Sequence, residues 1–333
     1  MSAGRLKRGL AWALGPLART LTGRRARILM YHRFAEVGTP RHTGAAQFDE
    51  HLRYIAAHYR PARLADVVAR LRAGEPLDDR TVVITVDDGY ADFYEHAYPA
   101  LRRHGIPATV YVVSEFISGR QWLWFDAIRW LVYAAPAGRC RMTFDGLTIE
   151  SNLDSDAQRE ALWSRFAGHC VTLPPARQWE LIGQLQDGLQ TALPERPPAE
   201  FGGMTWEQVR SLDPALVEVG AHTRTHPILS LCSVEEQREE IAGCKQAIED
   251  RTGRSVSAFC YPNGMPDDFT DDTVRIVREC GFSSAVMACG GMLAAAPDPY
   301  RLERVGAPSD VSQFRHCIDG LWEIKRALAR RAA

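Results

Sequence analysis

Short runs of β-branched and other apolar residues alternate along the chain with longer segments whose apolar positions recur at helical spacing. The short runs, bounded by polar or turn residues, predict buried strands, and the amphipathic segments predict helices. The predicted strands are 27–31, 81–86, 108–113, 217–221, 257–261 and 283–287. The predicted helices are 46–58, 64–73, 94–104, 234–250 and 271–280. This alternation predicts a mainly parallel α/β fold.

The interval 114–202 interrupts the alternation. It is too long for a simple loop, and it contains several tryptophans before a proline-rich exit around residues 194–198. We therefore predict a barrel domain over residues 26–333, interrupted at 114–202 by a mostly helical insertion over the barrel mouth. Its aromatic side chains could line a ligand site, although such clusters more often form the insertion's own core.

The first 25 residues form a separate basic and amphipathic segment. Leucines recur there at helical spacing among arginines and a lysine, and the apolar stretch 9–18 is too short to span a bilayer. Such a segment can lie on an anionic membrane surface, and a plain surface helix or tail is the alternative. Because no convincing cleavage signal follows, we predict a cytoplasmic protein with peripheral contact at the inner face of the membrane.

Composition adds few constraints. A chain of 333 residues that is 46% hydrophobic and 24% charged is ordinary for a globular protein. The net charge of −1 gives no reason to expect a nucleic-acid partner. The eight cysteines show no CxxC pair or other metal-ligand spacing, which favours free thiols in a reducing compartment over a disulfide framework.

Two adjacent acids, Asp87 and Asp88, directly follow the predicted strand 81–86 and precede Gly89. Neighbouring carboxylates repel each other unless a cation binds one or a proton stays on the other. The pair therefore suggests one acid as a metal ligand and its neighbour as a proton-transfer group. A strand that runs into an Asp-Asp-Gly turn is the structural alternative.

Two histidines four residues apart, His222 and His226, follow the predicted strand 217–221. On a helical turn this spacing places both imidazoles on one face, where they can bind one cation. With one acid of the aspartate pair they form a set of two histidines and one carboxylate that leaves coordination positions open. Such a set is typical of a catalytic rather than a structural metal.

In sequence order these motifs resemble the polysaccharide deacetylase family of the NodB-homology type. The resemblance rests on 85–89 (Thr-Val-Asp-Asp-Gly), 222–227 (His-Thr-Arg-Thr-His-Pro), 259–264 (Phe-Cys-Tyr-Pro-Asn-Gly) and the flanking stretches 27–32 and 203–206. It implies a distorted (β/α) barrel with the chemistry at its C-terminal rim. It also implies a metal-dependent hydrolase that removes an N-acetyl or similar acyl group from an amino sugar in a polysaccharide or lipid-linked saccharide, as in exopolysaccharide biosynthesis.

Placed on this chain, the resemblance implies that Asp88, His222 and His226 hold a divalent metal, with Zn²⁺ the expected ion. Asp87 is then the general base that takes a proton from the attacking water. The backbone N–H of Asn263 is the expected donor to the oxyanion.

Two positions depart from the family pattern. Cys260 stands where the family commonly has an arginine that pairs with the catalytic aspartate, and the stretch 301–305 lacks the histidine that commonly serves as general acid. Arg304 is a candidate replacement for the arginine, with a surface salt bridge as the alternative. His32, at the end of the first predicted strand, is a candidate proton donor, with a histidine bonded to backbone as the alternative.

Three classes of function stay open. The deacetylase is favoured. A non-haem Fe(II) oxygenase shares the set of two histidines and one carboxylate, but it predicts a His-x-Asp order that this chain lacks and leaves Asp87 without a role. A non-catalytic carbohydrate-binding protein on a degenerate barrel is favoured by the missing arginine and histidine.

Overall fold

The computed structural model of the chain describes residues 15–144 and 146–332. Residues 15–22 are helical, whereas the predicted amphipathic character of residues 1–14 lies outside the described residues. None of the helices in the described ranges combines the length and the apolar character needed to cross a membrane.

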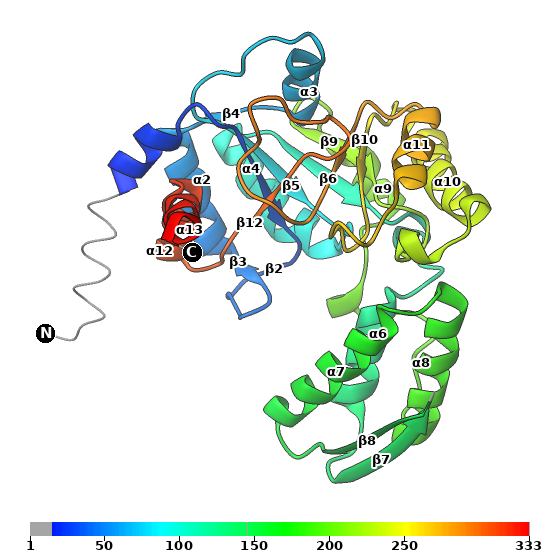
Figure 1. The fold of residues 1–333 in the computed structure, drawn as a ribbon. Coiled ribbons are helices and arrows are strands. Elements are labelled where there is room, and N and C mark those ends of the chain that lie inside the picture. The colour runs from blue at the N-terminus through cyan, green and yellow to red at the C-terminus, as the bar shows by residue number, and fades with distance from the viewer. Residues whose placement is uncertain (1–14, 145, 333) are drawn as a thin grey trace, which may run out of the picture.

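One curled sheet of parallel strands forms the centre of the molecule (Figure 1). Its main path runs in the order β11-β10-β9-β6-β5-β1-β12, and β4 pairs with β5. The strands are β1 (Arg27–Tyr31), β4 (Arg60–Pro61), β5 (Thr81–Val86), β6 (Ala108–Val112), β9 (Val217–Ala221), β10 (Ala258–Cys260), β11 (Ser284–Val286) and β12 (Val305–Gly306). The six strands expected from the sequence are all present, to within one residue at either end.

The stretch 302–306 connects the two edges of this sheet. Leu302 forms a parallel bridge with Val286 of β11, and Val305 pairs with Leu29 of β1. Sequence patterning did not predict a strand here, because two paired residues are too few to show a period of two. The connection brings Arg304 to the middle of the curled sheet.

Helices cover the outside of the sheet (Figure 1). The helix expected at 94–104 begins instead with a π-helical turn, Phe93–Ala97, before α4. A short pair of strands, β2 (Phe34–Ala35) and β3 (Thr43–Gly44), precedes α2. The helices are α2 (Ala45–His58), α3 (Leu64–Arg72), α4 (Tyr98–His104), α5 (Ser114–Ile117), α9 (Trp206–Ser211), α10 (Val234–Thr252), α11 (Asp271–Glu279), α12 (Val311–Ile318) and α13 (Leu321–Ala332).

Alternate strand residues face opposite sides of the sheet, as the period of two requires. Val83 packs with the apolar cluster that includes Ile28 and Tyr111, whereas Ile84 belongs to the cluster that packs against the helices. Asp87 lies two residues after Thr85 and four after Val83. The alternation along the strand therefore points its carboxylate to the same side of the sheet as these two side chains.

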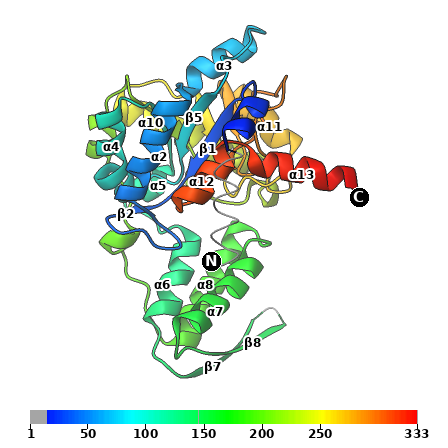
Figure 2. The same cartoon turned by 90° about the vertical axis from the view of Figure 1, so that its left-hand side faces the viewer.

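A second group of elements projects from one side of the barrel (Figures 1 and 2). It comprises α6 (Trp124–Ala134), the hairpin β7 (Arg139–Phe144) and β8 (Leu147–Asn152), α7 (Asp156–Cys170) and α8 (Pro175–Leu189). The hairpin was not expected in a mostly helical insertion, since many of its side chains are charged or polar. Buried residues of all these elements form a separate apolar core, which begins at Trp122, whereas Phe116 and Ile117 pack on the barrel.

Candidate metal centre and active site

The polar residues singled out in the sequence meet at the carboxyl ends of the parallel strands. Asp87 and Asp88 follow β5, and His222 follows β9. Because these strands are parallel, their carboxyl ends share one rim. A cavity of about 1170 Å³ opens there, and its lining includes both aspartates and the predicted residues His32, Asn263, His222 and His226.

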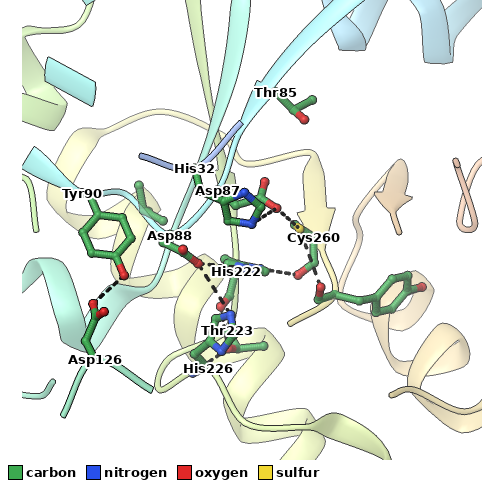
Figure 3. Close-up of polar contacts among 12 residues, drawn as sticks. His32, Thr85, Asp87, Asp88, Tyr90, Asp126, His222, Thr223, His226 and Cys260 are labelled. Atoms are coloured by element: carbon green, nitrogen blue, oxygen red, sulfur yellow. Dashed lines mark hydrogen bonds and ion pairs between the residues drawn. The ribbon is translucent and has the colours of Figure 1, made fainter. Parts of the chain in front are cut away.

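Asp88, His222 and His226 converge on one point (Figure 3). Oδ1 of Asp88 lies 3.4 Å from Nε2 of His222 and 3.6 Å from Nε2 of His226, and all three side chains are buried. Nδ1 of His222 lies 2.8 Å from the carbonyl oxygen of Cys260, where it donates a hydrogen bond. With the proton on Nδ1, the Nε2 atom of His222 carries a lone pair that faces the carboxylate of Asp88. Two acceptors that face each other are best satisfied by a cation between them.

The pKa values of the two histidines shift in opposite directions. Burial alone would lower the pKa of His222, but the Cys260 thiol and the Asp88 carboxylate raise it, so a proton competes for the metal position. Burial and the nearby charge of His222 lower the pKa of His226 to about 4, which keeps this imidazole neutral at pH 7. The convergence of two imidazoles and one carboxylate fits a divalent metal with open coordination positions.

The two histidines do not lie on a helical turn, as their spacing suggested, but on an irregular loop. Thr223 and His226 have positive φ angles of 66° and 62°. Oγ1 of Thr223 accepts a hydrogen bond from the N–H of His226 at 3.0 Å. The carboxylate of Glu240, from α10, accepts from the N–H groups of Arg224 and Thr225 at 2.8 and 2.9 Å.

Left-handed backbone is concentrated at this rim. Among the described non-glycine residues, six have positive φ, and four of these are Asp88, Thr223, His226 and Asn263. This conformation is unfavourable for residues with a Cβ atom, and it persists where the surrounding structure enforces it, often at functional sites. The clustering is independent support for a functional site here.

Asp87 forms a buried bidentate ion pair with Arg304. The Nη1–Oδ1 and Nη2–Oδ2 distances are 2.6 and 2.7 Å. Nε of Arg304 also donates to the carbonyl oxygen of Met287. Burial by itself would raise the pKa of Asp87, but the charge and hydrogen bonds of Arg304 outweigh it and hold that pKa below its usual value. The alternative of a surface salt bridge for Arg304 is therefore excluded.

The thiol of Cys260 lies beside this pair, 3.2 Å from Nη2 of Arg304. Asp87, His222 and Cys260 are close enough together to form a second candidate metal trio. The guanidinium of Arg304 already supplies the positive charge at that point, which makes the Asp88 trio the stronger candidate for the metal position.

His32 and Asn263 complete the predicted set. Nε2 of His32 lies 3.7 Å from Oδ2 of Asp87, and its side chain is 45% exposed to the cavity. The side-chain amide of Asn263 donates to Asp268 at 2.6 Å. Within the described residues the backbone N–H of Asn263 has no hydrogen-bond acceptor, so it is available to a ligand.

The cavity also contains a polar pair that sequence reasoning missed. The hydroxyl of Tyr90 donates to Oδ2 of Asp126 at 2.5 Å (Figure 3). Asp126 belongs to the first turn of α6, and burial raises its pKa to about 7. Asp126 stands in the Trp-Phe-Asp run at 124–126 of the sequence, but no spacing rule connects it with Tyr90, 36 positions earlier.

Residues 74–153 and 168–285 match the family described as polysaccharide deacetylase. This match covers more than half of the chain, which therefore belongs to the polysaccharide deacetylase family, hydrolases that act on the amide C–N bonds of N-acylated carbohydrates. Family membership excludes the Fe(II) oxygenase alternative.

Individual relatives resemble parts of the chain. "Putative polysaccharide deacetylase YxkH" of Bacillus subtilis (strain 168) is 26% identical over 126 residues, which are 38% of this chain and 41% of that protein. Poly-beta-1,6-N-acetyl-D-glucosamine N-deacetylase of Escherichia coli (strain K12) is 36% identical over 59 residues, 18% of this chain and 9% of that protein. The chain thus spans less than half the length of the curated relatives it matches.

Among the solved structures that share the fold are two deacetylase-type proteins. The Streptococcus pyogenes deacetylase PplD aligns with a TM-score of 0.57 at 18% identity, over 87% of this chain and 96% of that one. IcaB from Ammonifex degensii aligns with a TM-score of 0.58 at 19% identity, over 89% and 98%. These alignments confirm the predicted distorted barrel of the deacetylase type.

Proposed function

We propose that this chain is a metal-dependent enzyme that removes an N-acetyl or similar acyl group from an amino sugar in a saccharide. The observation that carries the proposal is the environment of Asp87. Arg304 keeps this carboxylate ionised beside the trio of Asp88, His222 and His226, within one cavity. A non-catalytic carbohydrate-binding protein would have no need for a buried, ionised acid at this position.

Asp88, His222 and His226 would hold the metal, and Zn²⁺ suits two imidazoles and one carboxylate. When bound, such an ion lowers the pKa of water and polarises an amide carbonyl. Asp87 accepts the proton of the attacking water, and the bidentate contact with Arg304 fixes its orientation. The backbone N–H of Asn263 donates to the amide oxygen as negative charge develops there.

His32 is our candidate for the proton donor to the leaving amine. Its imidazole reaches the cavity from the carboxyl end of β1, close to Asp87. In this arrangement it takes the place of the histidine that the stretch 301–305 lacks.

Membrane contact through residues 1–25 also belongs to the proposal, together with a cytoplasmic location. It is supported by Leu17 and Leu21, which are exposed on the helix 15–22 at a spacing of four. Sedimentation of the full chain with phosphatidylglycerol vesicles tests it. We expect binding that Leu17→Glu with Leu21→Glu abolishes, and equal sedimentation of both proteins would contradict it.

Metal analysis combined with acetate release from N-acetylglucosamine oligomers tests the enzymatic function. We expect metal near one equivalent in the wild type, metal retained in Asp87→Asn and lost in His222→Ala, and acetate release abolished in both variants. His32→Ala should retain metal and lose most of the activity. A wild type that takes up no metal after reconstitution, or that binds metal but hydrolyses no acylated sugar, overturns the proposal and leaves the carbohydrate-binding alternative.

A further inference from the structure

The cavity of the metal centre extends well beyond the residues that carry the proposed chemistry. It continues as a trough between α6 and α7, lined by Trp130 and Ala134 on one side and by Ala167, Gly168 and Val171 on the other. The trough begins at the metal centre, because the ring of Phe125 in α6 contacts that of His226 at 5.4 Å between centroids. From Phe125 to Ala134 the rise along α6 is about 14 Å.

The walls of the trough are mainly apolar. Nε1 of Trp130 donates to the carbonyl of Ala192 and Nε1 of Trp163 to that of Phe125, whereas Nε1 of Trp124 is buried without a partner among the described residues. The guanidinium of Arg129 lies 3.9 Å from the ring of Trp163. Saccharide subsites need convergent hydrogen-bonding groups, and apart from the arginines at the side of the cavity, Ser164 is the side chain of these walls that could still provide one. The trough therefore suits a hydrocarbon chain better than further sugar units.

Two arginines share one carboxylate at the side of the same cavity. Arg41, from the loop between β2 and β3, and Arg129, from α6, both contact Glu160 of α7, at 2.7 and 3.0 Å. The two guanidinium groups and the one carboxylate together therefore carry a net positive charge. The Arg41 side chain is 46% exposed, and Nη1 of its guanidinium donates to Glu160. Nη1 and Nη2 of Arg129 both donate to the same carboxylate, at 3.0 and 3.4 Å. After burial, the charges of Arg33 and Arg41 help to lower the pKa of nearby His42 to about 4. Guanidinium groups bind phosphate through paired hydrogen bonds.

We propose, on the basis of the deacetylase function above, that the substrate is an acylated amino sugar joined through a phosphate to a hydrocarbon chain. The sugar lies at the metal centre, the phosphate is bound by the exposed guanidinium of Arg41, to which Arg129 adds nearby positive charge, and the chain occupies the trough between α6 and α7. An extended polysaccharide as the occupant of the trough is the alternative that the experiments separate from this proposal.

Gly168 allows the trough to be filled without a clash. It lies inside α7, and an added Cβ meets no atom within 4 Å. Gly168→Trp therefore places an indole in the trough. Gly183, inside α8, is equally open but does not line the cavity, so Gly183→Trp is the matched control.

Binding is measured first, with dodecyl phosphate as the probe and the tryptophan fluorescence of the full chain as the signal. Gly168→Trp should weaken binding at least about tenfold, because several buried methylene groups lose their contacts. Arg41→Gln should also weaken it about tenfold through loss of a charged hydrogen bond. Gly183→Trp should leave the dissociation constant within about twofold. Equal dissociation constants for the wild type and Gly168→Trp would overturn the proposal.

Turnover is then compared for N-acetylglucosamine linked to dodecyl phosphate and for the N-acetylglucosamine tetramer. We expect Gly168→Trp to reduce kcat/KM for the lipid-linked substrate at least about tenfold more than for the tetramer. A larger loss on the tetramer would assign the trough to a polysaccharide instead. If neither substrate releases acetate, the deacetylase function fails, whereas the binding result still reports whether the trough accepts a chain.

Discussion

The guanidinium that faces Asp87 comes from Arg304, 217 positions further along the chain. Residue 260, where the family pattern has an arginine, is a buried cysteine whose thiol contacts the same guanidinium. A positive charge therefore lies beside Asp87, and it comes from the stretch that connects the two sheet edges and not from residue 260. The sequence suggested Arg304 only by its charge, since nothing local links it with Asp87.

Arg304→Lys keeps the charge but replaces the planar, bidentate guanidinium contact with Asp87 by a single ammonium group. We expect kcat to fall on the order of tenfold to a hundredfold, because Asp87 loses orientation and one charged hydrogen bond. Stability should also fall by about 3 kcal/mol, since part of a buried charge is left unpaired. Steady-state kinetics and urea unfolding measure both effects. Arg301→Lys, at an exposed neighbouring position, is the control, and equal kcat values for the two variants would contradict the assignment.

The raised pKa of Asp126 predicts a pH dependence of stability. Its folded-state pKa of about 7 exceeds the ordinary aspartate value of 3.8, so the folded protein binds this proton more tightly than the unfolded chain. The free energy of unfolding contributed by this group is therefore greatest below pH 4 and is lost as the pH rises to about 7. Asp126→Asn should remove this fall, on the order of 3 kcal/mol, in urea titrations between pH 4 and 8. Asp187→Asn, at an exposed position of the insertion, should retain it.

At the scale of elements, the loop that carries His222 and His226 depends on helix α10. The loop has no regular hydrogen bonding of its own, and the carboxylate of Glu240 accepts from two of its N–H groups and from the hydroxyl of Thr225. The spacing of His222 and His226 suggested a helical turn that could align the imidazoles. Instead, α10 holds an irregular loop whose left-handed residues aim both rings at Asp88.

Glu240→Ala removes this support without touching a proposed metal ligand. We expect metal affinity to fall about tenfold to a hundredfold, as is common when groups that orient metal ligands are lost. Competition with a chelator measures it. Glu239→Ala, one residue away on the exposed side of α10, should leave the affinity unchanged. A similar loss in both variants would show that helix stability, and not the loop contact, is responsible.

At the scale of the whole molecule, the apolar core of the insertion is separate from the apolar clusters of the barrel. The barrel core and the core of α6, α7, α8 and the hairpin consist of different residues. Such cores can unfold separately, because few apolar contacts need to break between them. The aromatic cluster noted in the sequence belongs mainly to the second core, but its edge also forms a wall of the cavity.

Leu181→Ala, in the centre of the second core, tests this independence. A buried leucine truncated to alanine costs about 2–5 kcal/mol. We expect faster amide hydrogen exchange across α6, α7 and α8 and unchanged exchange in β5, β6 and β9. Ile276→Ala, in the barrel core, should produce the opposite pattern. Uniform acceleration throughout in either variant would show that the molecule unfolds as one unit.

The sequence by itself determined the main strands and helices of the barrel, because β-branched runs and amphipathic periods are local properties. It also determined where Asp87, Asp88 and His222 lie, since each directly follows a strand whose end is visible in the pattern. Only the tertiary structure decided that Arg304 faces Asp87, that Asp126 meets Tyr90, and that the cavity continues between α6 and α7. Those contacts join residues far apart along the chain, and their meeting depends on sheet order and on packing between helices, which local spacing does not specify.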